Sequence, residues 1–297
     1  MKVVKDLFKL LLLVIITTIV FIVISMLLPF SEGFQAGSEK ADPSGLLFIL
    51  LVHTWVCITL FYIIRHSRWR GAKLIVWLML AYFFVYSFMG QIETFFFRSA
   101  FPLLTPSDIF FIAVANGMVV LAGVPLGVML FGQKQNEAVY GAFGYERRPL
   151  PSLPYQLALI GISYVCIYFL FGYFVAWQVE DLRVFYSGDP TGHGFLASMA
   201  NNFHDNPVLF PFQFVRGVLF GVFVLPVVQM FKGRPGQLLI SLILVFVSPG
   251  LGLAIPNFLF PDTVRWAHFA EMITSMSLFA VVIWWVYVKV PHTLEKS

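Results

Sequence analysis

Seven polar or ionisable side chains in otherwise apolar stretches of the sequence are candidates for a functional site. They are His53, Gln91, Glu93, Gln213, Arg216, His268 and Glu271. Arg216 follows Gln213 by three residues, so the two lie on one face of a helix. His268 and Glu271 have the same spacing. Arginine can hold a carboxylate or phosphate through two hydrogen bonds, and buried histidine or glutamate can exchange protons. These residues predict a site that binds or transports a small polar or anionic solute, or a lipid headgroup.

Arg216 carries the strongest constraint on this site. No acidic residue lies within a turn of it in the sequence. An unpaired guanidinium is too costly to bury in an apolar medium, so a partner has to come from elsewhere. We expect that partner to be Glu93, Glu271 or an anion from outside the protein.

A metal or haem site is an alternative interpretation of the same residues. His53, Glu93, His268 and Glu271 have the side chains that bind Zn²⁺ or iron, and the two histidines could also ligate a haem. The sequence contains no His-Glu-x-x-His or His-x-x-x-His motif. It also lacks the Gly-x-Ser-x-Gly motif of a nucleophilic serine. An enzyme is therefore less favoured than a binding protein.

A third interpretation has no chemistry. Polar side chains in three apolar segments can hold helices in register through hydrogen bonds between them. The protein would then be a scaffold, a sensor or an accessory subunit, which recognises a protein partner through the outer loop 178–207 or forms a homo-oligomer.

The composition decides which elements position these residues. Of the 297 residues, 59% are hydrophobic and 11% are charged, whereas soluble domains carry about 25% charged residues. This composition predicts an integral membrane protein, whose partner is the lipid bilayer. The basic residues fall in short connections and form no patch for nucleic acid.

Eight segments are long and apolar enough to cross a bilayer, which takes about 20 residues. They are residues 8–29, 45–65, 72–91, 106–131, 154–177, 208–231, 236–257 and 263–289. Thr105 and Asp108 have the spacing of a capping box at the start of the fourth segment. The sequence predicts an all-α, polytopic helix bundle that forms one domain over residues 1–297. A cleaved signal peptide is the alternative for the first segment.

Charge predicts the orientation of the bundle. Most lysines and arginines lie in residues 1–9, 65–73, 132–152, 231–237 and 289–297. Basic residues concentrate on the cytoplasmic side of membrane proteins, so both termini are predicted to be cytoplasmic, in the inner membrane of a bacterium. Residues 45–131 and 208–289 also share an order of apolar, basic and polar stretches, which suggests a parallel repeat of four plus four helices.

All seven candidate residues then fall in the outer half of the bilayer. His53, for example, is eight residues into its segment, about 12 Å at 1.5 Å per residue. The outer loop 178–207 mixes aromatic and polar residues and is predicted to form an ordered cap. Arg265 and Trp266 are expected to reach headgroups and water as anchors. Gly217, Gly221 and Pro226 are expected to let their helix bend.

Overall fold

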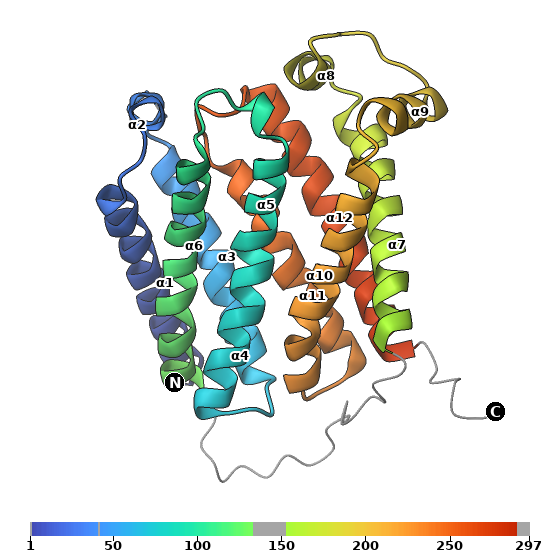
Figure 1. The fold of residues 1–297 in the computed structure, drawn as a ribbon. Coiled ribbons are helices and arrows are strands. Elements are labelled where there is room, and N and C mark those ends of the chain that lie inside the picture. Colours follow the sequence, from blue (N-terminus) through green and yellow to red (C-terminus); the bar gives the residue numbers. More distant parts are fainter. Residues whose placement is uncertain (1, 41, 133–152, 290–297) are drawn as a thin grey trace, which may run out of the picture.

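The computed structural model describes residues 2–40, 42–132 and 153–289, and it is an all-α bundle of eight long apolar helices (Figure 1). This confirms the predicted fold class of a multi-pass membrane protein. The spans are α1 (Lys2–Leu27), α3 (Gly45–Arg65), α4 with α5 (Gly71–Phe83 and Met89–Phe96), α6 (Pro106–Phe131), α7 (Leu153–Phe171), α10 (Leu209–Met230), α11 (Pro235–Leu251) and α12 (Asp262–Lys289). The predicted loop 132–152 and the C-terminal segment 289–297 lie almost wholly outside the described residues.

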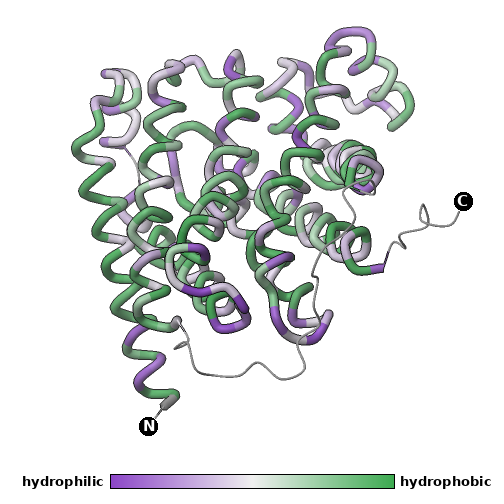
Figure 2. Tube along the Cα trace, turned by 60° about the horizontal axis from the view of Figure 1, so that its bottom comes forward, coloured by the Kyte–Doolittle hydropathy of each residue, from purple (hydrophilic) through white to green (hydrophobic). Residues whose placement is uncertain are grey.

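The two ends of the bundle differ. The N-terminus lies at one end, which we call the terminal end (Figure 1). Three short helices lie at the other end, which we call the cap end: α2 (Glu32–Ser38), α8 (Glu180–Ser187) and α9 (Phe195–Asp205). The predicted cap 178–207 thus contains two helices. Apolar residues follow the long helices, whereas hydrophilic residues gather in the connections between them (Figure 2).

Local sequence explains several helix boundaries. The amide of Thr105 donates to Asp108 Oδ2 at 2.9 Å, and the amide of Asp108 donates to Thr105 Oγ1 at 3.2 Å. This is the predicted capping box at the start of α6. Asp108 also accepts hydrogen bonds from the amide and hydroxyl of Ser31, at 2.8 and 2.7 Å. A single carboxylate thereby starts α6 and fixes the corner between α1 and α2.

The third span extends to Phe96, five residues beyond the predicted end at residue 91. In the sequence, Gln91 and Glu93 predict the end of a helix, because polar residues that follow an apolar segment are usually exposed to water. In the structure both lie within α5. Glu93 is bound to an arginine of α10, so the helix continues past these residues inside the bundle.

Two spans contain a turn of wider, π-helical backbone. The Met89 amide bonds the carbonyl of Phe84, five residues back, and the Trp177 amide bonds the carbonyl of Gly172 at 2.7 Å. The segments Phe84–Phe88 and Gly172–Ala176 are named η1 and η4. Such turns redirect neighbouring side chains and are frequent at functional sites. Both segments line the cavity described below.

The half of the bundle toward the terminal end is a packed apolar core. Leu60, Leu78, Val224 and Ile283 come from four different spans, and all are completely buried. The helices pair as α1 with α6, α7 with α10, and α11 with α12. This half is therefore densely packed, whereas the cap end contains the cavity described below.

Gly217 and Gly221 lie where α10 packs against α7. A Cβ atom on Gly217 would lie 2.6 Å from Tyr164 Cβ and 2.9 Å from Gly161 Cα. A Cβ atom on Gly221 would lie 3.0 Å from Leu157. Small residues four apart let the backbones of membrane helices approach closely. These glycines therefore allow α10 to pack closely against α7, while Pro226 lies within the helix as expected.

Candidate functional site

A cavity of about 1300 Å³ opens in the cap half of the bundle. Its wall includes residues of α1, α3, α5, α6, α7 and α12, together with the cap helices α8 and α9. Asn116 is ten residues into α6 and Met276 is fourteen residues into α12. At 1.5 Å per residue, the cavity reaches about 15–20 Å from the cap end, near the middle of a hydrocarbon core of about 30 Å.

Five of the seven predicted site residues line this one cavity. They are His53, Gln91, Glu93, His268 and Glu271. Gln213 and Arg216 are 0% and 2% exposed and are not among the lining residues of the described chain. Arg216 instead supports the wall from behind.

Arg216 and Glu93 form a two-point ion pair. Arg216 Nη1 lies 2.6 Å from Glu93 Oε1, and Nη2 donates to Oε2 at 2.7 Å. The guanidinium also donates to Gln213 Oε1 at 2.7 Å and to the carbonyl of Met89 at 3.1 Å. Of the three partners expected for Arg216, the structure thus selects Glu93. The pair connects α10 to α5 and holds the Glu93 carboxylate in the cavity wall.

Aromatic rings surround this cation. The rings of Tyr164, Phe212 and Phe220 have their centroids 5.6, 5.7 and 5.9 Å from Arg216 Cζ. At such distances the ring faces attract a cation and also exclude water. Both terminal nitrogens of the guanidinium are engaged with protein oxygens, so the arginine offers no free fork to the cavity in this arrangement.

A second chain of polar contacts leads from the cap into the cavity. The Tyr186 hydroxyl of α8 lies 3.0 Å from His268 Nε2. His268 Nδ1 lies 3.9 Å from Glu271 Oε2, and the Ser275 hydroxyl donates to Glu271 Oε1 at 3.2 Å. The distance of 3.9 Å is too long for a hydrogen bond. Glu271 is thus held by one hydroxyl and has room to bind another donor.

Burial raises the pKa of the Tyr186 hydroxyl, and the nearby carboxylates of Glu93 and Glu271 act in the same direction. This phenol therefore keeps its proton at neutral pH. When it donates to His268 Nε2, a neutral imidazole carries its own proton on Nδ1, the nitrogen nearest Glu271.

Other polar groups in the wall have few protein partners. His53, 2% exposed, uses Nδ1 to bond the Thr18 hydroxyl at 3.0 Å. Within the described ranges, Gln91 Oε1 is buried without a hydrogen bond, and the partly buried Asn116 also lines the cavity. Buried polar atoms in folded proteins are normally bonded to protein, water or ligand. These groups could therefore bind the polar part of a ligand.

Asn116 and Tyr186 do not appear among the predicted site residues. Asn116 is an amide in the middle of an apolar span, a signal as clear as that of Gln213. Tyr186 carries no such signal, because it lies in the outer loop and reaches the cavity only through the fold of the cap.

The four candidate metal ligands do not form a cluster. Across residues 2–40, 42–132 and 153–289, no three His, Cys, Asp or Glu side chains are grouped to hold a metal ion. Among the four candidates the structure records one contact, between His268 and Glu271. The geometry of the described chain gives no support to the metal interpretation.

Arg265 departs from its predicted role as an anchor that reaches water. Its residue is 3% exposed. Its guanidinium donates to the carbonyls of Leu253 and Ala254, at 3.2 and 2.8 Å, and binds Asp262 at 2.8 Å. Carbonyls at the end of a helix lack partners within it, and a cation satisfies them well. Trp266, 44% exposed, lies at the surface as expected.

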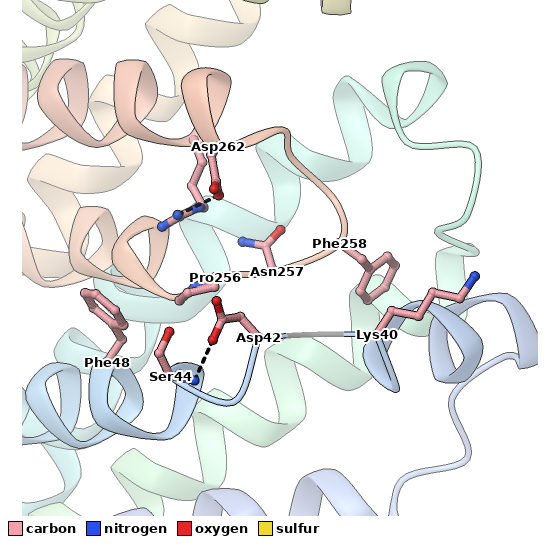
Figure 3. A pocket seen from close by; sticks show the side chains of 9 residues that line it. Lys40, Asp42, Ser44, Phe48, Pro256, Asn257, Phe258 and Asp262 are labelled. Carbon is pink, nitrogen blue, oxygen red and sulfur yellow. Dashed lines mark hydrogen bonds and ion pairs between the residues drawn. The ribbon is translucent and has the colours of Figure 1, made fainter.

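A smaller pocket of about 300 Å³ lies at the cap end beside Arg265 (Figure 3). Lys40, Asp42 and Asn257 contribute to its wall. The Ser44 amide donates to Asp42 Oδ1 at 2.8 Å, and the bonds from this amide and the Ser44 hydroxyl lower the pKa of Asp42. This pocket has a mostly polar wall, and none of the seven predicted residues lines it.

The large cavity, which five of those residues line, is the candidate functional site. Comparisons with protein-family models, with curated proteins and with solved structures find no match to this chain.

Proposed function

We propose that the protein binds an amphiphilic, lipid-like molecule in the cavity of the cap half. The polar head would lie near Glu93, His268 and Glu271. An apolar tail would lie along the part of the wall formed by Phe21, Ile22, Met26 and Ile49 of α1 and α3. The observation that supports this proposal is that ionisable side chains and an extensive apolar surface line the same cavity.

The size of the cavity supports a ligand with a chain. Sites for small molecules usually measure about 300–1,000 Å³. A cavity of about 1300 Å³ with extensive apolar lining exceeds what a small polar solute would fill. A lipid or similar amphiphile would fill it and would remove apolar surface from water.

The charges in the wall favour a head that donates hydrogen bonds. Glu93 is neutralised by Arg216, while Glu271 contacts no lysine or arginine within the described part of the chain. An ionised carboxylate only accepts hydrogen bonds, so an ammonium or hydroxyl head suits this wall. An anionic solute, the other ligand favoured by the sequence, would have to displace Glu93 from Arg216.

The packed terminal half supports binding at the cap end rather than passage through the protein. Transport would require this apolar core to open a second path. The proposal is therefore binding at the cap end, and transport is the alternative.

Two glycines offer a matched test. A Cβ atom on Gly90 or on Gly236 would meet no atom within 4 Å, but only Gly90 lines the cavity. Gly90→Phe should place a phenyl ring in the cavity, one helical turn from Glu93, and obstruct the proposed site of the polar head, whereas Gly236→Phe should leave the cavity unchanged. The measurement is native mass spectrometry of protein released from nanodiscs that contain equal amounts of phosphatidylethanolamine and phosphatidic acid with identical acyl chains.

We expect the wild type and Gly236→Phe to retain one phosphatidylethanolamine. The lipid-bound fraction of Gly90→Phe should be about tenfold lower, which corresponds to about 1.4 kcal/mol of binding free energy. Equal retention by the two variants would refute binding in this cavity. A preference for phosphatidic acid would refute the proposed chemistry of the head.

A further inference from the structure

The cap helix α9 presents three different faces. Leu196, Ala200 and Phe203 recur at the spacing of one helical face, and all three are exposed. Ser198, Met199 and Asn202 belong to the side that lines the cavity. Asn201 and Asp205 lie on a third, exposed and polar face. A helix surrounded by water on its free side would not need the apolar face.

The apolar face is large for one short helix. Leu196 is 80% exposed and Phe203 is 66% exposed. No lysine or arginine occurs in α9. Exposed apolar residues that cluster in this way mark a surface that contacts protein or membrane.

This face continues the lipid-facing surface of two spans. Phe195, the first residue of α9, stacks on Phe174 of η4 with ring centroids 5.4 Å apart, and Phe203 contacts Phe210 of α10 at 5.6 Å. Phe174 and Val208, which flank these contacts, are themselves 59% and 61% exposed. The apolar side chains of α9 therefore lie beside exposed apolar side chains at the cap ends of two spans.

We infer that α9 lies in the membrane–water interface of the leaflet at the cap end. Leu196, Ala200 and Phe203 contact lipid, while Asn201 and Asp205 face water. Such a division between an apolar and a polar face is typical of interfacial helices. A different side of α9, with Ser198, Met199 and Asn202, lines the cavity, so the same helix borders both the cavity and the lipid. This inference rests on α9 itself and does not depend on the proposed ligand.

Site-directed spin labelling tests the inference on the full chain in phospholipid bilayers. Nitroxides are attached to Leu196→Cys, Phe203→Cys and, as the control on the same helix, Asn201→Cys. The background is Cys166→Ser, because Cys57 is completely buried. Collision rates with oxygen, which concentrates in lipid, are compared with those of a water-soluble nickel chelate.

The expected oxygen-to-nickel ratio is several-fold higher at residues 196 and 203 than at residue 201. A ratio at 196 and 203 as low as that at 201 would place this face in water and overturn the inference. Low rates with both reagents at 196 and 203 would mean that a protein surface covers the face, which would overturn it as well.

Discussion

Arg216 and Glu93 form an ion pair at the wall of the cavity. Glu93 lines the cavity, and Arg216 lies behind it. Pairs of this kind stabilise little compared with apolar side chains, because both charges lose their water. Removing one partner is costly, because it leaves the other charge buried alone. Arg216 is 2% exposed and surrounded by aromatic rings, whereas the Glu93 side chain is 24% exposed. Loss of the ion pair therefore costs more free energy at Arg216 than at Glu93.

We predict that Glu93→Gln destabilises the protein by about 3 kcal/mol, since the guanidinium loses its neutralising charge. Glu180→Gln on the exposed surface of α8 is the matched control and should change little. The double substitution Glu93→Leu with Arg216→Met should recover most of the loss. The free energy of unfolding of each variant is measured in detergent by titration with a denaturing surfactant. Equal stability of Glu93→Gln and the control would contradict the role of the pair.

The candidate site could be predicted in part at this scale. An ionisable residue in an apolar span can be recognised in the sequence alone. The seven predicted residues are expected at a similar depth in the membrane, and five of them line one cavity. The sequence could not show which side chains would satisfy each other. That Glu93 takes the guanidinium of Arg216 depends on the rotation of α5 and α10, which depth alone does not fix.

Helix contacts in this bundle depend on small residues as well as on apolar ones. Gly161 and Gly217 face each other where α7 and α10 pack, and a Cβ atom on Gly217 would meet the backbone of α7. Backbone cannot move aside as the end of a side chain can. The position therefore excludes any residue larger than glycine unless the two helices separate.

Gly217→Ala is predicted to destabilise the protein by about 1–3 kcal/mol, the usual cost of overpacking. Alanine is a better helix former than glycine, so Gly236→Ala, with open space around its Cβ atom, should be neutral or stabilising. Thermal unfolding of the two variants in the same detergent measures the difference. A Gly217→Ala protein as stable as the Gly236→Ala control would contradict the close approach.

Most of the fold could be predicted because span length and hydropathy are local properties. The eight helices match the predicted segments closely, and Thr105 with Asp108 forms the expected capping box. The extension of the third span to Phe96 could not be predicted, because it depends on a partner in a distant helix. The π-helical turns also lack a sequence signal, since no single residue type requires them.

The whole molecule divides into a packed half and an open half. Apolar side chains fill the terminal half, while the cap half encloses about 1300 Å³. The charge distribution predicts that the terminal end is cytoplasmic, and we propose that the cap end faces outward from the membrane. The cavity and the apolar face of α9 would then both belong to the outer leaflet, where an amphiphile could reach them from the lipid.

The most direct test is an experimental structure of the protein in lipid nanodiscs, beside that of Gly90→Phe. We predict elongated density in the wild-type cavity, with its polar end within hydrogen-bond distance of Glu93 or Glu271, and no such density in the variant. A wild-type cavity that is closed by its own side chains, or that holds only separate water molecules, would contradict the proposed function.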